Sequence, residues 1–363
     1  MYRCLLGVLG AAAVVLGVFG TPALAENLHS GAVYTMTNAP SGNEVLAYRR
    51  DHAGNLELVG AFATGGSGAP GLGNQGGLVM SGDHRFLIGV NAGTDSIFVM
   101  RIRSHGLELV ATMSSGGDRP ISVASHRDLL YVLNAGVPNG ISGFFMSHDG
   151  ILSPIPGSIK ALSGPVVGPA QIGFSRHGST LVVTEKATSM ITTYIVGDDG
   201  VPSDSIANPS SGMTPFGFAF DKRGHLIVSE AFGGSPGASA VSSYEVGDDG
   251  ALELISGSVL SGQTAACWVT VVRRFAYTTN TADGTLSSFA ISHDGEVALE
   301  AGVAAATGVG SAPIDMAVTK SQRHIYVLNA GAHTITGYRV HDGTLTPIGA
   351  VAVPIGANGL VAR

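Results

Sequence analysis

The chain has 363 residues, of which 45% are hydrophobic and only 12% are charged, and its formal net charge is −7. No basic run or stripe accompanies this acidic balance, which argues against nucleic acid as a partner. The 53 glycines fall mostly at turn positions between short apolar runs, a pattern typical of an all-β protein and not of a disordered chain.

The first 25 residues read as a secretory signal peptide. Arg3 supplies a positive charge, residues 5–19 are apolar, and Ala23-Leu24-Ala25 fits an A-x-A cleavage site. A membrane anchor is the alternative, but the apolar run is short for a span of about 20 residues. We therefore predict a periplasmic or secreted protein in which residues 26–363 form one domain, with no membrane contact after cleavage. One cysteine then remains, so no intrachain disulfide can form.

A repeat runs through the rest of the chain seven times. Each unit has a strand-like segment such as residues 129–136, LLYVLNAG, and these segments end at Asn38, Asn91, Asn134, Glu185, Glu230, Asn280 and Asn329. The next strand of each unit carries a large hydrophobe, which is Tyr48, Met100, Phe144, Tyr194, Tyr244, Phe289 or Tyr338. A turn that ends in glycine follows, most often Asp-Gly, which is a strong hairpin signal because both residues tolerate positive φ.

Four strands per unit with a period of about 48 residues are typical of a β-propeller. A linear solenoid is the alternative, but its end units should be atypical caps. Here the two ends complement each other, since the chain begins at the second strand of a unit and residues 358–362 read as a missing first strand. We predict an all-β, seven-bladed β-propeller with four strands per blade. The C-terminal strand completes the first blade and closes the ring, which removes exposed sheet edges.

On these motifs the chain resembles the seven-bladed lactonase-type propellers, which include 6-phosphogluconolactonase and the carboxymuconate-lactonizing enzymes. The resemblance rests on the YVLNAG-type strand, on the segment DGILSPIPGS at 149–158 and on the pattern GP-x-x-x-x-F-x-x-x-G at 168–178. It covers essentially the whole mature chain. It implies that a small carboxylated or sugar-derived lactone is opened or formed. Non-catalytic binding of a small molecule, glycan or protein is the alternative, because such propellers also serve as binders.

The chain departs from one motif of this family. Family members carry G-P-R-H at the start of an inner strand, followed by a strand that ends in V-N-E. Here residues 168–171 read Gly-Pro-Ala-Gln and residues 183–185 read Val-Thr-Glu. The glutamate is kept, whereas the arginine is replaced by Ala170 and the histidine by Gln171. A phosphate group needs a cationic clamp, so this departure argues against a sugar-phosphate substrate.

The propeller geometry predicts a polar ring at the mouth of the central channel, on the face where the innermost strands begin. Glu185 and Glu230 are candidate catalytic carboxylates, because a buried carboxylate can act as a general base, and Gln171 could hold a substrate carbonyl. The candidate substrate-binding residues are Arg119, Asn134, Lys186, Phe216, Trp268 and Asp315. Structural alternatives remain open: the glutamates could accept loop N–H groups, Trp268 could plug the channel, and Asp315 could cap a turn.

The sequence predicts no metal and no cofactor. Ten of the twelve histidines fall at turns on the opposite face, away from the expected site, and no H-x-x-x-H, C-x-x-C or EF-type spacing is present. The glycine-rich segment 65–73 is interpreted as a loop between blades, because it lacks the Lys-Ser/Thr of a phosphate-binding loop. The expected partner is a small-molecule lactone or another small ligand, or a protein, and the oligomeric state stays open.

Overall fold

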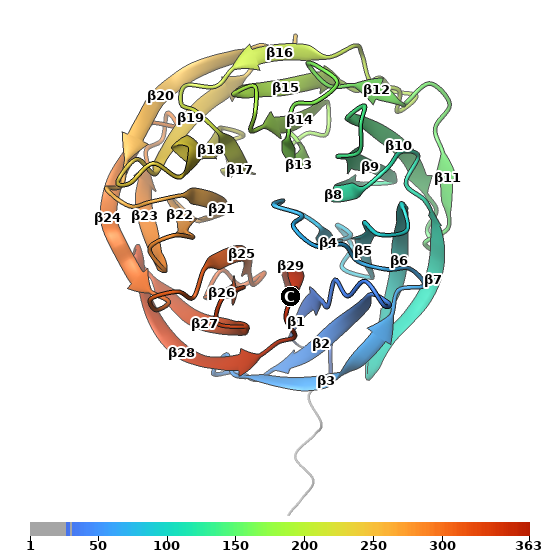
Figure 1. Cartoon of the computed structure of the whole chain (residues 1–363), viewed down its shortest axis with the longest axis horizontal. Helices are drawn as coiled ribbons and strands as arrows, with labels where there is room; N and C mark the ends of the chain where they lie inside the picture. The colour runs from blue at the N-terminus through green and yellow to red at the C-terminus, as the bar shows by residue number, and fades with distance from the viewer. Residues whose placement is uncertain (1–26, 30) are drawn as a thin grey trace, which may run out of the picture.

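Seven antiparallel sheets stand around a central channel in the computed structural model, which describes residues 27–29 and 31–363. Figure 1 shows the sheets as blades of a ring, with the outermost strands at the rim. The predicted seven-bladed propeller is therefore confirmed. The predicted signal peptide at 1–25 lies outside the described residues. Among the residues that are described, no helix is long and apolar enough to cross a bilayer.

The innermost strands line the channel. They are β29 (Asn358–Ala362), β4 (Leu78–Met80), β8 (Pro120–His126), β13 (Pro169–Phe174), β17 (Pro215–Phe220), β21 (Ala266–Val272) and β25 (Pro313–Val318). We call the face where these strands begin the top face and the other the bottom face. The strands at the second position are β1 (Ala32–Met36), β5 (Phe86–Asn91), β9 (Leu129–Asn134), β14 (Thr180–Glu185), β18 (Leu226–Glu230), β22 (Phe275–Asn280) and β26 (His324–Asn329).

The strands at the third position are β2 (Glu44–Arg50), β6 (Ser96–Arg103), β10 (Gly140–Met146), β15 (Met190–Ile195), β19 (Ala240–Val246), β23 (Thr285–Ile291) and β27 (Thr334–His341). The rim strands are β3 (Leu56–Ala63), β7 (Gly106–Ser114), β16 (Ile206–Pro209), β20 (Leu252–Leu260), β24 (Val297–Ala306) and β28 (Thr344–Ala352). In the third blade two short strands, β11 (Leu152–Pro154) and β12 (Lys160–Ala161), share the rim position beside β10. A short 3₁₀ turn, η1, spans Phe232–Gly234.

The ring closes as the sequence predicts. β29 pairs antiparallel with β1, so that Val33 faces Ala362 and Thr35 faces Leu360. The hydroxyl of Thr35 also donates a hydrogen bond of 2.7 Å to the carbonyl of Gly359. Because the last strand of the chain completes the blade that the first strand begins, no unpaired inner edge is left there.

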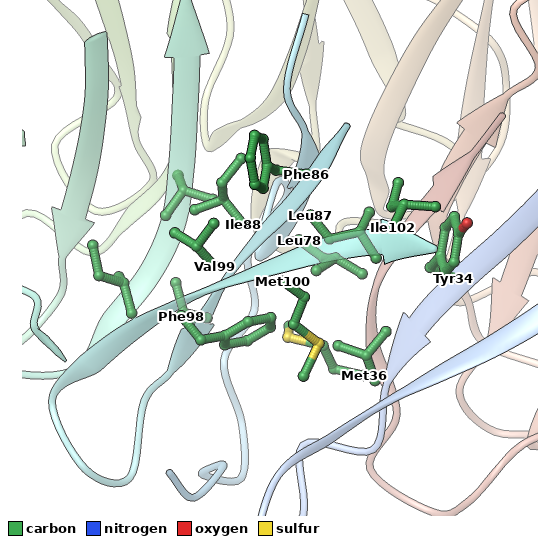
Figure 2. Close-up of a cluster of buried hydrophobic side chains, with 14 of the residues drawn as sticks. Tyr34, Met36, Leu78, Phe86, Leu87, Ile88, Phe98, Val99, Met100 and Ile102 are labelled. Atoms are coloured by element: carbon green, nitrogen blue, oxygen red, sulfur yellow. The ribbon is translucent and has the colours of Figure 1, made fainter. Parts of the chain in front are cut away.

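The core lies between neighbouring blades. β5, β14, β22 and β26 are buried along their whole length, since both of their faces pack against other sheets. Figure 2 shows one such cluster, in which Tyr34 and Met36 of the first blade meet Leu78 and Met100 of the second. The seven predicted large hydrophobes of the third strands are all buried. Burying aromatic and sulfur side chains between sheets is the main apolar contribution to a fold of this kind.

Candidate functional site

A long connection crosses the top of the channel. The chain leaves β3 at Ala63 and enters β4 at Leu78, whereas the next connection needs only residues 115–119. Figure 1 shows the segment that leads into β4 reaching toward the middle of the ring. We call residues 64–77 the channel segment. Its glycine-rich sequence was correctly interpreted as a loop between blades, but its path across the channel was not foreseen.

Two amide side chains anchor the channel segment to strands on several blades. Asn74 donates to the carbonyl of Ile121 on β8 and exchanges hydrogen bonds with Asn358 on β29. Gln75 uses its side chain to bridge both backbone groups of Val269 on β21, at 2.9 and 3.2 Å. Its backbone N–H donates to the carbonyl of Ala170 on β13 at 3.1 Å. Four of the innermost strands are thus tied to one loop.

Lys186, Phe216 and Trp268 form a cluster beneath the channel segment. The Lys186 ammonium donates a hydrogen bond of 2.5 Å to the carbonyl of Gly73 and lies 4.8 Å from the centre of the Phe216 ring. The Phe216 and Trp268 rings are 4.8 Å apart, and the indole N–H donates to the carbonyl of Asn74 at 2.8 Å. Trp268 is only 5% exposed, so its indole is buried beneath the channel segment.

Burial shifts the acidity of this cluster. It lowers the pKa of Lys186 to about 8, although the nearby Cys267 acts in the opposite direction. It raises the pKa of the Cys267 thiol to about 11, with hydrogen bonding to Thr281 and the charge of Lys186 working against the rise. Near neutral pH Cys267 is therefore a thiol, and Lys186 is mostly protonated, with about one tenth as the neutral amine.

Arg119 reaches the same loop from another side. Its backbone has a positive φ of 53°, and its N–H donates to the Asp95 carboxylate at 2.7 Å. The guanidinium donates to the carbonyls of Pro70 and Gly71, at 2.8 and 3.4 Å. Arg119 and Lys186 therefore place two cations against the carbonyl oxygens of residues 70–73.

Gln171 and Asp315 lie deeper in the channel. Together with Gln75 they line a cavity of about 270 Å³ among the innermost strands. The Gln171 side chain pairs with both backbone groups of Phe218, at 2.7 and 3.1 Å, and so joins β13 to β17. The Asp315 carboxylate accepts the N–H groups of Met316 and Leu360. Burial raises the pKa of Asp315 to about 7, because these two hydrogen bonds only partly offset the lost hydration.

Glu185 does not lie at the channel mouth, and its predicted placement there is wrong. The side chain is 0% exposed and points into its own blade. Oε1 accepts from the N–H of Ser163 at 3.1 Å and from the hydroxyl of Thr192 at 2.6 Å. Oε2 accepts from the hydroxyls of Ser163 and Thr188. All four donors belong to the protein, because a buried carboxylate must replace its hydration with hydrogen bonds.

Glu230 and Asn134 occupy the same repeat position and are also internal, so the expected polar ring does not form. Glu230 Oε1 accepts from Gly212 N–H at 2.8 Å and from the Ser242 hydroxyl at 2.6 Å. Its Oε2 has no donor among the described residues. Burial raises the pKa of Glu230, and the hydroxyls of Ser242 and Ser258 together with the N–H of Gly212 oppose this rise. Asn134 donates to Ser142 at 3.1 Å.

The sequence reasoning missed Asn74 and Gln75. Neither belongs to the repeat, since the channel segment is an insertion relative to the other connections between blades. The unusual distance from residue 63 to residue 78 was the available signal. A longer connection at the top of a ring can either fold outward or fill the channel, and the pattern of residues does not distinguish these paths.

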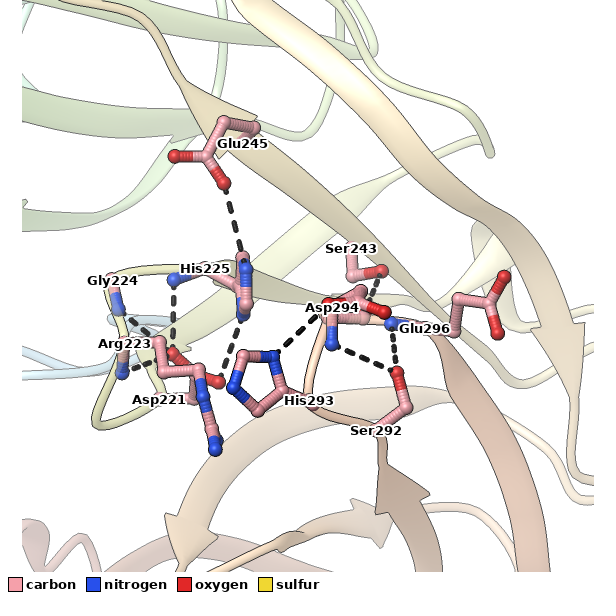
Figure 3. A network of polar contacts seen from close by, with 11 residues as sticks. Asp221, Arg223, Gly224, His225, Ser243, Glu245, Ser292, His293, Asp294 and Glu296 are labelled. Atoms are coloured by element: carbon pink, nitrogen blue, oxygen red, sulfur yellow. Dashed lines mark hydrogen bonds and ion pairs between the residues drawn. The ribbon is translucent and has the colours of Figure 1, made fainter.

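The histidines at the bottom face are mostly exposed, but one is held in a network. Figure 3 shows His225 between Asp221, 2.9 Å from Nδ1, and Glu245, 3.5 Å from Nε2. Burial acts to raise the pKa of Asp221, but hydrogen bonds from His225 and from the backbone of Arg223 hold it below its ordinary value. In the part of the chain that the structure describes, no three histidine, cysteine or acidic side chains are arranged to hold a metal ion.

Solved structures similar to this one include three that are named as gluconolactonases. The periplasmic gluconolactonase of Pseudomonas aeruginosa superposes with a TM-score of 0.73 at 17% identity, over 92% of this chain and 98% of that one. Two provisionally assigned 6-phosphogluconolactonases follow. The Bacteroides fragilis protein has a TM-score of 0.71 at 14% identity, over 94% of this chain and 100% of that one. The Bacteroides uniformis protein has a TM-score of 0.70 at 17% identity, over 92% and 99%.

At these identities the structures establish the fold alone, and no curated protein matches the chain. The family comparison goes further. The model described as "Lactonase, 7-bladed beta-propeller" matches residues 29–140 and 228–358, which is more than half of the chain. With its blade count, strand order and ring closure in agreement, the chain belongs to the seven-bladed β-propeller lactonase family.

Proposed function

We propose that this lactonase-family chain opens a small carboxylated lactone at the top of the channel, where Arg119 and Lys186 hold the substrate. One observation carries the proposal: both cations are directed at carbonyl oxygens of the same short segment, residues 70–73. A carboxylate is a stronger acceptor for such donors than a peptide carbonyl, because the hydrogen bond is then charge-assisted on both sides. A carboxylated ligand would therefore replace the channel segment at these two side chains.

The lowered pKa of Lys186 supports it as the proton acceptor in its neutral form, and Arg119 alone then holds the exocyclic carboxylate. In its neutral form the amine takes a proton from water as the water oxygen bonds to the lactone carbonyl carbon. The bond to the ring oxygen then breaks, and that oxygen takes up a proton to become the hydroxyl of the product. Arg119 would bind the exocyclic carboxylate through its planar donors. Glu185 as the general base stays a prediction of the family resemblance, and its four internal donors favour a structural role.

A non-catalytic propeller is the second candidate. The observation in its favour is that the channel segment fills the mouth of the channel, with Asn74 and Gln75 tied to four inner strands. In that case Arg119 and Lys186 stabilise the loop and the top face is a closed surface.

Proton release on a panel of lactones, with and without an exocyclic carboxylate, distinguishes the two candidates. We expect Lys186→Gln to lower kcat at least 100-fold and Arg119→Gln to raise KM for the carboxylated lactones only. Lys222→Gln, at an exposed bottom-face turn, is the matched control and should behave as wild type. Equal turnover in Glu185→Gln and wild type would remove Glu185 from the mechanism. No turnover on any lactone by the folded protein would favour the non-catalytic propeller.

We further propose that the protein is exported. The signal-peptide pattern at 1–25 supports this, and one structural neighbour is a periplasmic gluconolactonase. Mass spectrometry of the protein isolated from its native cells should give a chain that begins after Ala25. A chain that retains the first 25 residues would contradict export with cleavage.

A further inference from the structure

A second cavity, unrelated to the channel, lies on the bottom face of the second blade. Its volume is about 550 Å³, which is within the range of small-molecule sites. Side chains that line it include Asp83, His84, Arg85, Arg101, Arg103 and Arg363. We call it the arginine cavity. Four arginines and one aspartate in this set are unusual for a chain with a net charge of −7.

The arginines come from three separate places in the chain. Arg85 precedes β5, Arg101 and Arg103 lie at the end of β6, and Arg363 follows β29. The guanidiniums of Arg85 and Arg101 both lie over the ring of Phe86, with their Cζ atoms 5.3 and 5.2 Å from its centre. The buried ring limits how these long side chains can move, because the contact between cation and aromatic face is attractive.

Arg85 and Arg101 each form one ion pair, and both pairs are long. The carboxylate of Asp83 is 3.8 Å from Arg85, and that of Asp149 is 3.8 Å from Arg101, both beyond hydrogen-bond distance. Only Arg103 has a close partner, Glu108 at 2.5 Å.

The remaining arginine donors bond neutral groups or nothing. Arg85 contacts a ring nitrogen of His148 at 2.7 Å, and Arg363 donates to the carbonyl of His84 at 3.2 Å. The Nε of Arg101 is buried without any partner among the described residues. A terminal nitrogen of Arg101 donates to the carbonyl of Asp149 at 2.9 Å. An oxyanion in the cavity would offer this donor a charged acceptor in place of a neutral one.

The sixth blade has an arginine at the position of Arg85 but no second arginine over the ring. Arg274 precedes Phe275 as Arg85 precedes Phe86, and its Cζ lies 4.5 Å from the ring centre. The residue opposite Phe275 on the next strand is Ala290, whereas the residue opposite Phe86 is Arg101. Arg339 of the seventh blade and Arg49 of the first blade occupy the position of Arg101, opposite His324 and Ala32. Among the described residues, only the second blade places both arginines over one phenylalanine ring.

We infer that the arginine cavity is a binding site for a small molecule with several oxyanion groups. Arginine suits this chemistry because its planar donors pair with phosphate or carboxylate oxygens two at a time. The cavity is separate from the channel residues, so it would be a second site, independent of lactone opening. Phosphoryl and carboxyl ligands share the chemistry, and the experiment below separates them.

The test is calorimetric titration of the full chain with pyrophosphate and with citrate at 0.15 M salt. We expect saturable 1:1 binding of at least one probe with a Kd below about 1 mM. The tighter probe identifies the oxyanion class. Arg85→Gln combined with Arg101→Gln should weaken binding at least 10-fold, and raising the salt should also weaken it. Arg274→Gln, the matched arginine on the sixth blade, should bind as wild type does.

Three results would overturn the inference: no saturable binding of either probe, unchanged affinity in the double variant, or an equal loss in Arg274→Gln. If the double variant does not fold, Arg363→Gln is the replacement, since this residue follows the last strand. It should weaken binding at least 3-fold, and wild-type affinity in this variant would count against the site. Because Lys186 and Arg119 are untouched, lactone turnover is unaffected by these changes.

Discussion

Glu185 and Glu230 sit at the same position of two successive blades, yet their surroundings differ. Both are fully buried, and both accept a backbone N–H and a hydroxyl from the third strand at Oε1. At Oε2 they differ: Glu185 accepts two hydroxyl hydrogen bonds, whereas Glu230 accepts none of good geometry among the described residues. The hydroxyls of Ser258 and Ser210 lie close enough to lower the pKa of Glu230. The position in the repeat sets the direction of the glutamate side chain. The neighbouring residues set how many hydrogen-bond donors stabilise the buried carboxylate.

The missing donors can be traced to glycines. The loop residue that donates its N–H is Ser163 in one blade and Gly212 in the other, so one hydroxyl is absent. Thr188 lies three residues after Glu185, and three residues after Glu230 the chain has Gly233. A Cβ on Gly212 would lie 2.2 Å from Glu230 Oε2, so a serine there would require the Glu230 side chain to move.

The largest expected effect concerns Asp315, a third buried carboxylate that has only two backbone donors. Its folded pKa of about 7 lies well above the ordinary aspartate value of 3.8. Both states are protonated below pH 3.8, and the unfolded chain ionises first as the pH rises. The free energy of unfolding should therefore fall by on the order of 4 kcal/mol between pH 4 and 7.

Urea denaturation across this pH range measures the effect. In Asp315→Asn the free energy of unfolding should fall much less as the pH rises. The slope of stability against pH is the quantity to compare, because asparagine also alters the hydrogen bond that Leu360 N–H donates and so shifts the stability at every pH. Asp294→Asn, at an exposed turn, is the control and should keep the wild-type slope. Parallel curves for wild type and Asp315→Asn would refute a raised pKa at this site.

The next prediction compares the two glutamates directly. Glu185→Gln places an NH₂ group against hydroxyl donors and should lower the free energy of unfolding by about 2 kcal/mol. Glu230→Gln removes a charge that lacks a donor at Oε2, so its stability should change by less than about 0.5 kcal/mol or increase. Both values come from urea denaturation at pH 7. Equal losses of unfolding free energy in the two variants would contradict the proposed difference between the two glutamates.

The smallest expected effect makes the Glu185 site resemble that of Glu230. Ser163→Ala removes one hydroxyl donor from Oε2 and should cost about 1.5 kcal/mol, the value of a hydrogen bond to a charged group. A double-mutant cycle with Glu185→Gln should show that the two effects are not additive. Strict additivity would mean that the hydroxyl of Ser163 contributes nothing through the carboxylate.

Much of the fold could be predicted because each blade repeats the same physical problem. The strand at the second position of each blade is buried on both faces. The apolar residues of this strand, and the Asn or Glu that ends it, therefore recur at a regular period. The pairing of β29 with β1 followed from the complementary ends of the chain. The candidate site was less predictable. Glu185 was expected at the channel mouth, but the direction of a side chain at a strand end depends on which donors lie beside it.

The sequence by itself determined the seven blades, the four strands of each and the closure of the ring, because periodic burial leaves a periodic pattern. Only the tertiary structure decided what closes the top of the channel and which side chains line the arginine cavity. Asn74 and Gln75 meet four inner strands, and Arg85 meets Arg101 over one aromatic ring, through contacts between distant parts of the chain. Such contacts have no period, and they depend on the path of one inserted loop and on single residues that differ between blades.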